Sequence, residues 1–244
     1  MTMILRGQKC GYDEDCPEIQ QEQGGGPLII TGYRPGAEYT AENEITVEFP
    51  AAGAPELASL NIPDFNAYRQ RMCPGPGDMF RVQTLSRYGN EDGLADAYIN
   101  GDPPPSAERL SGWGTKLDAY HVAGITYRNL HVVDGLLSDN LRMQFEWAYA
   151  FNSAHHMDIR IVDVAEIPAV RALPRLGDFW VLNDTHVALC RYDTDGRPLG
   201  HAAVEFSMAN AYWAAADMAW QLSTPFATWW AAHPRYHRAT QRAA

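Results

Sequence analysis

Cysteine and lysine are both scarce in this chain, and each scarcity excludes a class of chemistry. Four cysteines in 244 residues are too few and too scattered for the disulfide framework of a small secreted protein. Only Lys9 and Lys116 among the 19 basic residues are lysine, so Schiff-base chemistry has almost no candidates. Reduced thiols suit a reducing compartment, and we therefore expect a cytoplasmic protein.

Long apolar runs and familiar catalytic motifs are absent as well. No stretch approaches the roughly 18 apolar, uncharged residues that a membrane span requires, and Arg6 interrupts the start before a signal-peptide core could form. The patterns G-x-x-x-x-G-K-[ST], G-x-S-x-G and H-E-x-x-H do not occur. The sequence therefore predicts a protein without a membrane segment, without a cofactor and without a standard catalytic motif.

Positive charge is in short supply too, since the net charge is −11. Residues 1–60 hold three basic and ten acidic side chains, and the remainder holds 16 basic and 20 acidic side chains. Proteins that bind nucleic acid normally carry a basic stripe, and here only the arginines of the stretch 233–242 come near one. We expect no direct binding to nucleic acid.

The composition divides the chain into three parts. A Gly-Gly-Gly-Pro turn at 24–27 and an alternating stretch at 45–49 predict a small β-rich unit. Residues 50–55, which include Gly53, have the composition of a linker, so we place a domain boundary there. The expected organisation is a β-rich module at 1–55, one larger domain at 56–233 and a flexible tail at 234–244.

Strand patterns dominate the second half of the larger domain. Residues 125–133 have strand composition and end at the turn formers Asp134 and Gly135. Three further strands, separated by short turns, are typical of an antiparallel meander and are expected at 178–182, 185–192 and 199–206. We predict an α+β fold in which an antiparallel sheet, containing this C-terminal three-strand meander, packs against helices.

Residues 138–151 permit two interpretations. Apolar side chains alternate with polar ones from Leu141 to Phe151, which favours a strand, whereas Ser138 is a good N-cap and favours a helix. In both cases Arg142 and Glu146, four residues apart, project to the same side.

Several blocks of sequence, in the same order, resemble the actinobacterial family of domain of unknown function 6879. The resemblance covers about residues 60–233 and favours the helix at 138–151. Its blocks are Leu-Ser-Asp-Asn-Leu-Arg at 137–142, Asp-Ile-Arg-Ile at 158–161, Asp-Phe-Trp-Val-Leu at 178–182, Gly-Arg-Pro-Leu-Gly at 196–200 and Thr-Pro-Phe at 224–226. Members of the family are encoded near helix-turn-helix regulators, which implies a regulatory association.

The chain departs from this family just before the strand at 158–161. Family members usually have Ala-Gly-Glu there, whereas this chain has His155, His156 and Met157. Any role of that glutamate is therefore missing here. Residues 1–55 lie outside the resemblance and form an added N-terminal module.

Five side chains near the segment 138–151 are candidate site residues. Arg142, Glu146 and Asp158 could act in catalysis as an anion clamp and carboxylate bases, and Asn152 and Arg160 could bind the substrate. The alternative, which we favour, is that Arg142 and Glu146 form a structural ion pair.

Two other groups of residues have both a functional and a structural interpretation. Cys10 and Cys16 could supply half of a metal site, but no second pair of ligands lies near them in the sequence, so reduced thiols are the favoured interpretation and we predict no metal. Four of the seven tryptophans lie between residues 213 and 230. They could stack on bases or a flat ligand, but without interleaved basic residues we expect them in the core.

Two hypotheses for function follow. The first is a non-catalytic regulatory or interaction module whose protein partner is a helix-turn-helix transcriptional regulator. The alternative is an enzyme or toxin that acts on an anionic small molecule or nucleotide through Arg142, Glu146 and Asp158.

Overall fold

An eight-stranded mixed sheet forms the centre of the protein. The computed structural model describes residues 2–6, 18–22, 28–33, 44–49, 60–204 and 206–241. In spatial order the strands of the sheet are β12 (Thr224–Pro225), β8 (Met157–Asp163), β7 (Ile125–Val133), β6 (Gly77–Gln83), β9 (Phe179–Leu182), β10 (His186–Tyr192), β11 (Pro198–Ala203) and β5 (Leu60–Ile62).

The adjacent strands β8, β7 and β6 run parallel, and the other neighbouring pairs run antiparallel. The predicted α+β class is confirmed. The prediction of an antiparallel sheet was wrong in extent, because the meander of β9, β10 and β11 is one part of a larger mixed sheet. Short turns in a sequence reveal antiparallel neighbours, whereas parallel neighbours are joined by long helical connections that leave no pairing signal.

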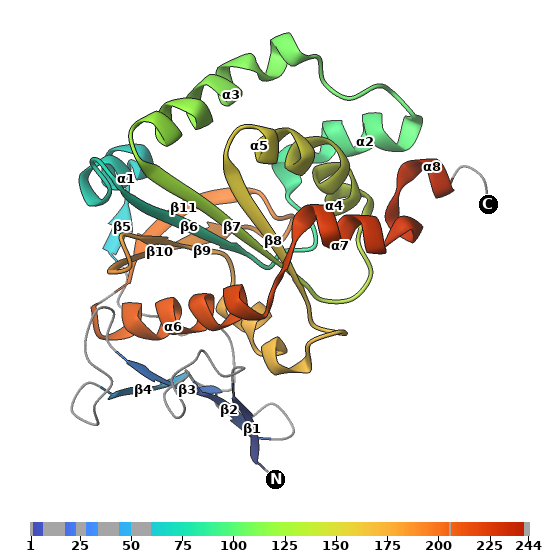
Figure 1. Ribbon diagram of the computed structural model, residues 1–244. Coiled ribbons are helices and arrows are strands. Elements are labelled where there is room, and N and C mark those ends of the chain that lie inside the picture. The colour runs from blue at the N-terminus through green and yellow to red at the C-terminus, as the bar shows by residue number, and fades with distance from the viewer. Residues whose placement is uncertain are drawn as a thin grey trace.

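Helices cover both faces of the sheet (Figure 1). On one face lies α6 (Phe206–Leu222), and on the other lie α2 (Asp92–Asn100), α3 (Ala107–Val122) and α5 (Ala150–Ala154). The remaining helices near this second face are α1 (Phe65–Met72), α4 (Asp139–Met143) and α7 (Phe226–Ala232). In the described part of the chain, no helix has the length and hydropathy that crossing a membrane would demand.

Alternation along the strands divides the core into two layers. Phe80 and Val82 of β6 belong to the apolar cluster on the side of α6, whereas Met79 belongs to the cluster on the opposite face. Tyr212 of α6 is fully buried and packs edge-on against Phe179, with ring centroids 4.9 Å apart. Apolar side chains therefore pack against both faces of the sheet.

Residues 139–154 form a continuous helical stretch, so the helical interpretation is confirmed. The Ser138 hydroxyl accepts a hydrogen bond from the Leu141 amide at 3.2 Å, as an N-cap does. Between α4 and α5 the stretch widens into the π-helical segment η2 (Gln144–Tyr149). The sequence alternates like a strand because some polar side chains of this helix are buried against other parts of the protein. Gln144, for example, is only 4% exposed.

The turn between β9 and β10 is also as predicted. Asn183 and Asp184 adopt φ values of 50° and 57°, a left-handed conformation that Asn and Asp tolerate better than most residues. The Asn183 side chain accepts a hydrogen bond from the Asp78 amide at 3.0 Å and donates one to the Met72 carbonyl at 2.8 Å. The turn thereby joins the end of α1 to the start of β6.

The N-terminal part contains a separate four-stranded antiparallel sheet in the order of the sequence. Its strands are β1 (Thr2–Arg6), β2 (Glu18–Glu22), β3 (Leu28–Tyr33) and β4 (Glu44–Phe49). Strands β3 and β4 lie against α6 (Figure 1). The predicted linker at 50–55 and the candidate ligands Cys10 and Cys16 lie outside the described residues, so those predictions stay open.

The C-terminal aromatic residues belong to the core, as expected. Phe226 and Trp229 are buried in the cluster on the face opposite α6, and both rings contact Phe145 of η2. Trp230 is half-buried against the same cluster. These rings therefore stabilise the fold and do not form an exposed stacking platform.

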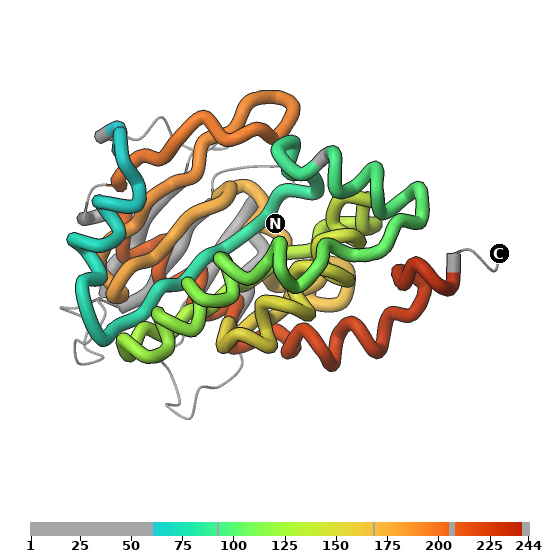
Figure 2. The backbone as a smooth tube through the Cα atoms, turned by 90° about the horizontal axis from the view of Figure 1, so that it is seen from above, coloured from blue at the N-terminus to red at the C-terminus, as the bar shows by residue number. Residues whose placement is uncertain are grey.

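The segment that the sequence predicts as a flexible tail makes specific contacts. It contains η5 (Pro234–Tyr236) and α8 (Arg238–Gln241), beside the helical stretch 139–154 (Figure 2). Tyr236 is 5% exposed, and the Arg238 guanidinium donates hydrogen bonds to the carbonyls of Asp102 at 2.7 Å and Tyr98 at 3.3 Å. These contacts attach the segment to α2.

We expect that Tyr236→Ala lowers the free energy of unfolding by about 3 kcal/mol, because truncating a buried aromatic ring leaves a cavity. Urea denaturation followed by tryptophan fluorescence measures the change. Thr240→Ala, an exposed position in the same segment, is the matched control and should differ from wild type by less than about 0.5 kcal/mol. Equal stability of the two variants would show that the segment is not packed in solution.

Candidate functional site

A cavity of about 490 Å³ lies on the sheet face opposite α6. Its floor consists of side chains from β6, β7, β9 and β10, and its walls come from α1, α3 and the helical stretch 139–154. Most residues of the helical wall are three, four, seven and eight positions apart, namely Gln144, Trp147, Ala148, Phe151 and Asn152, and Met143 and Tyr149 of the same stretch also line the cavity. The helical period of this stretch therefore determines which of its side chains reach the cavity.

The floor is unusually polar for a buried sheet face. Alternate residues of β6 point to the cavity, and strand register places Arg81 beside Asn129 of β7 and Trp180 of β9. Gln83 and Asn129 are both buried amides that line the cavity. Buried polar groups need partners, so this floor requires an internal hydrogen-bond network.

The first part of that network is centred on Asp178, which is 2% exposed. One carboxylate oxygen accepts hydrogen bonds from the Thr84 amide at 2.6 Å, the Thr84 hydroxyl at 3.1 Å and the Leu85 amide at 3.3 Å. The other oxygen accepts from the hydroxyls of Tyr88 at 2.8 Å and Tyr192 at 3.0 Å. Asp178 thereby holds the chain after β6, and two tyrosines that line the cavity, in place.

The second part of the network is centred on the Tyr149 hydroxyl. It donates a hydrogen bond to Oε1 of the Gln83 side chain at 3.1 Å. It also lies 2.7 Å from Nδ1 of His131 and 3.4 Å from Nδ2 of the Asn129 side chain. Burial, and secondarily the positive charge of Arg81, lower the pKa of His131 to about 3. His131 is therefore a neutral, structural side chain at physiological pH.

Two arginines bring positive charge to the cavity. Arg81 lies near the rings of Tyr88 and Trp180, at 5.9 Å and 5.5 Å from their centroids, and one of its terminal nitrogens is 3.9 Å from the Asp178 carboxylate. Its Nε is buried and has no hydrogen-bond partner among the described residues. Arg69 of α1 is 6% exposed and lies on the opposite wall.

The surroundings of Arg69 are unusual for a buried cation. Its guanidinium donates to the Met79 sulfur at 3.4 Å and lies 4.8 Å from the centroid of the Tyr120 ring. A thioether and an aromatic ring are weak partners for a full charge. Within the described part of the chain, no carboxylate lies within ion-pair distance of Arg69.

An acid and an amide face each other on the wall near η2. The Gln144 amide donates to the Glu91 carboxylate at 2.5 Å, and burial raises the pKa of Glu91. The other end of the same side chain, Oε1 of Gln144, is buried without a hydrogen-bond donor in the described residues. This oxygen remains available to a donor on a ligand.

His201 and Cys190, two further titratable groups of the lining, are uncharged at neutral pH. His201 stacks on Phe65 with ring centroids 3.9 Å apart, and burial together with the charge of Arg81 lowers the pKa of His201 to about 4. Burial raises the pKa of Cys190 to about 12, so its thiol is protonated and is a poor nucleophile. The lining therefore favours binding over nucleophilic chemistry.

The structure places Arg142 and Glu146 outside the cavity lining. Arg142 pairs with Asp139 at 3.0 Å. The Glu146 carboxylate accepts hydrogen bonds from the Tyr98 hydroxyl at 2.8 Å and the Arg238 amide at 2.9 Å. The two residues lie on the same side of the helix, but among the described residues no ion pair joins them, so the favoured interpretation of a structural Arg142–Glu146 pair was wrong. The partners of Glu146 join the helix to α2 and to the C-terminal segment.

The other predicted site residues are dispersed. Asp158 is exposed at the start of β8, and Arg160 donates to the Trp220 carbonyl at 3.1 Å, on the side of α6. Only Asn152 lines the cavity, where its amide oxygen accepts from the Trp113 indole at 2.8 Å. The structure therefore does not gather the predicted catalytic residues around one centre.

The residues that do form the site were missed because no single element or motif contains them. Arg69, Arg81 and Gln144 belong to three different elements, and Arg69 and Arg81 stand in no motif. One signal was present: Met79, Arg81 and Gln83 alternate with apolar residues, which marks a strand face that is more polar than the other.

The departure at 155–157 also has a structural explanation. His156 adopts a φ of 66°, a conformation that glycine reaches without strain, and its ring stacks on His121 at 3.9 Å. His155 turns instead to Asp118, with 2.9 Å between Nδ1 and the carboxylate. Met157 lines the cavity, so an apolar side chain occupies the position where the resemblance would place a glutamate.

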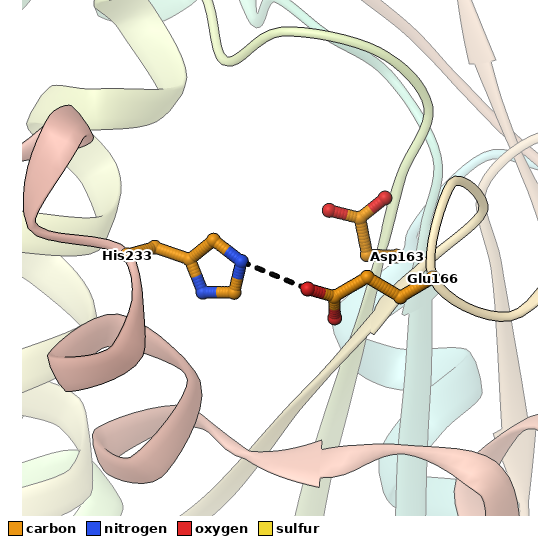
Figure 3. A group of neighbouring side chains, drawn as sticks. All are labelled: Asp163, Glu166 and His233. Atoms are coloured by element: carbon orange, nitrogen blue, oxygen red, sulfur yellow. Dashed lines mark hydrogen bonds and ion pairs between the residues drawn. The ribbon is translucent and has the colours of Figure 1, made fainter.

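A second group of ionisable residues lies away from the cavity lining (Figure 3). Asp163 and Glu166 approach His233 at the end of α7, and these ligand types suit a divalent metal. His233 lies 3.0 Å from the Glu166 carboxylate through Nε2 and 2.7 Å from the Trp229 carbonyl through Nδ1. Both ring nitrogens have protein partners, and we assign the group the structural role of joining α7 to the end of β8.

Comparison with known proteins identifies a family. Residues 70–231 match the family model described as a domain of unknown function, DUF6879. No curated protein matches the chain.

Asp178→Asn should lower the free energy of unfolding by about 3–5 kcal/mol, because a carboxamide cannot accept all the hydrogen bonds of the carboxylate and leaves Arg81 unpaired. Chemical denaturation measures the loss. The matched control is Asp158→Asn at an exposed position, which should leave stability unchanged. A stable Asp178→Asn variant would contradict the central role of this carboxylate.

Stability should fall in mild acid because of His131. Its pKa is 6.5 unfolded and about 3 folded, so between these values only the unfolded chain binds the proton. The stability contributed by neutral His131 is therefore present above pH 6.5 and is lost by about 1.4 kcal/mol per pH unit below it. Urea denaturation of wild type and His131→Gln at several pH values tests this, since the advantage of wild type should shrink between pH 6.5 and 5.5. A constant difference would show that His131 is not buried neutral.

Proposed function

The chain belongs to the family DUF6879, and we propose that its domain is a non-catalytic regulatory module that binds a small organic molecule in the cavity between the sheet and α1, α3 and η2. The supporting observation is the set of buried polar atoms without partners in the lining. Nε of Arg81 and Oε1 of Gln144 are both desolvated by the fold and both lack a hydrogen bond among the described residues.

Such atoms point to a ligand because their desolvation is costly. A buried polar group without a hydrogen bond costs about 1–3 kcal/mol, and native proteins carry few of them outside functional sites. A ligand that supplies the missing partners recovers this free energy on binding. The volume of about 490 Å³ and the mixture of aromatic walls with a few polar groups are typical of small-molecule sites.

The enzymatic alternative has less support. A general base must reach the reacting proton, but the Glu146 carboxylate is occupied by Tyr98 and Arg238, and Asp158 is exposed and outside the lining. The thiol of Cys190, whose pKa is raised to about 12, is protonated. These arrangements favour recognition of a molecule over its conversion.

The partner in this proposal is a helix-turn-helix transcriptional regulator, following the family resemblance. A net charge of −11 opposes direct contact with DNA, so a partner would supply the DNA-binding surface. Contacts of Arg238 connect the C-terminal segment to α2 and to η2, whose Trp147 lines the cavity. Ligand binding could therefore alter a surface at this end of the domain.

A thermal-shift screen of small organic molecules tests the binding function. A ligand at 100 times its Kd should stabilise the folded state by about 2.7 kcal/mol and raise the melting temperature. Ala148→Phe, which fills the cavity from its wall, should abolish the shift, whereas Ala150→Phe at an exposed position of the same helical stretch should retain it.

Two results would count against the proposal. One is a wild-type melting temperature that no compound changes, and the other is an equal shift in the two variants. For the regulatory part, co-purification from a native lysate should recover a DNA-binding regulator in an amount that changes with the ligand. Turnover of the compound by the purified protein would favour the enzymatic alternative.

A further inference from the structure

We propose that the ligand of this cavity is a small planar aromatic monocarboxylate with a hydrogen-bond donor on its ring, an inference that rests on the proposed binding function. Three features of the lining carry it: the net charge, the shape of the charged groups and the arrangement of the rings.

One positive charge of the lining has no counter-charge among the residues that the structure describes. The positive charge of Arg81 has the Asp178 carboxylate 3.9 Å away, whereas the partners of Arg69 among the described residues are a sulfur atom and a ring. A buried charge without a counter-charge is costly. One negative charge on the ligand would compensate Arg69.

The charges of the lining also argue against a ligand with two negative charges. Lys116 lines the cavity but is exposed, so water already solvates its ammonium group. Glu91 adds an acidic side chain to the wall, and burial raises the pKa of its carboxyl group. A phosphate would place about two negative charges beside a site with one uncompensated positive charge. A carboxylate matches that charge and also fits the planar fork of a guanidinium.

The rings that surround the arginines define the body of the ligand. The rings of Phe65, Tyr127 and Trp180 lie next to one another in the lining. The centroid of the Trp180 ring is 5.4 Å from that of Phe65 and 5.6 Å from that of Tyr127. Aromatic rings in such walls pack well against a flat aromatic guest. Oε1 of Gln144 lacks a donor, and a ring N–H would supply one.

Isothermal titration calorimetry with three matched probes tests the inference: indole-3-carboxylate, the neutral indole-3-carboxamide and the dianion 3-indoxyl phosphate. We expect the carboxylate to bind at least about tenfold more tightly than either of the others, because a charge-assisted hydrogen bond to a buried guanidinium exceeds a neutral one. Arg69→Met, which removes the charge and keeps an apolar stem, should weaken binding of the carboxylate by about tenfold and leave the carboxamide unchanged.

The matched control is Arg71→Met, an exposed arginine on the same helix that does not line the cavity, and it should bind like wild type. If Arg69→Met does not fold, the comparison of the three probes on the wild-type protein decides by itself. Equal affinity for carboxylate and carboxamide, or tighter binding of the phosphate, would overturn the monocarboxylate and leave the binding function intact. If none of the probes binds but the thermal-shift screen finds another ligand, the inference of a monocarboxylate is wrong and the proposed binding function stands. If the screen also finds no ligand, both the monocarboxylate and the binding function are wrong.

Discussion

The buried carboxylate of Asp178 is the interaction on which the rest of this site depends. It lies at the start of β9, yet it accepts hydrogen bonds from the backbone after β6 and from tyrosines of two other segments. One desolvated charge thus fixes the position of Tyr88 and Tyr192 and stands beside Arg81. Because a buried charge must be fully hydrogen-bonded, these distant segments have a single low-energy arrangement around it.

The polar floor of the cavity follows from this constraint. A sheet that is shielded on both faces normally carries apolar side chains on both, as the side facing α6 does. The opposite face carries Arg81, Gln83, Asn129 and His131, which the Asp178 and Tyr149 networks satisfy in part. Nε of Arg81 and Oε1 of Gln144, two of the buried atoms without partners among the described residues, lie in the lining, and we therefore describe the cavity as a recognition site.

Particular elements show how far sequence patterns reach. The strand at 125–133 was predicted with its bounds, because a continuous run of β-forming residues followed by Asp134 and Gly135 is a local signal. The helix at 139–154 was ambiguous because its polar residues face protein instead of water, and the N-cap decided correctly. Arg142 and Glu146 were correctly placed on one side, but Arg142 pairs with Asp139 three residues before it. Glu146 accepts hydrogen bonds from Tyr98 and Arg238, which no spacing rule connects to it.

The sequence by itself determined the α+β class, most of the strands of the larger domain, the turn at Asn183 and the burial of the C-terminal aromatic rings, because each depends on composition and period within a short segment. Only the tertiary structure decided the parallel pairing of β6, β7 and β8 and the meeting of Arg69 with Arg81 across one cavity. Those features depend on contacts between separate elements, and the parallel strands are joined by long helical connections. Neither hydrophobic period nor local propensity encodes which distant side chains will share a buried space.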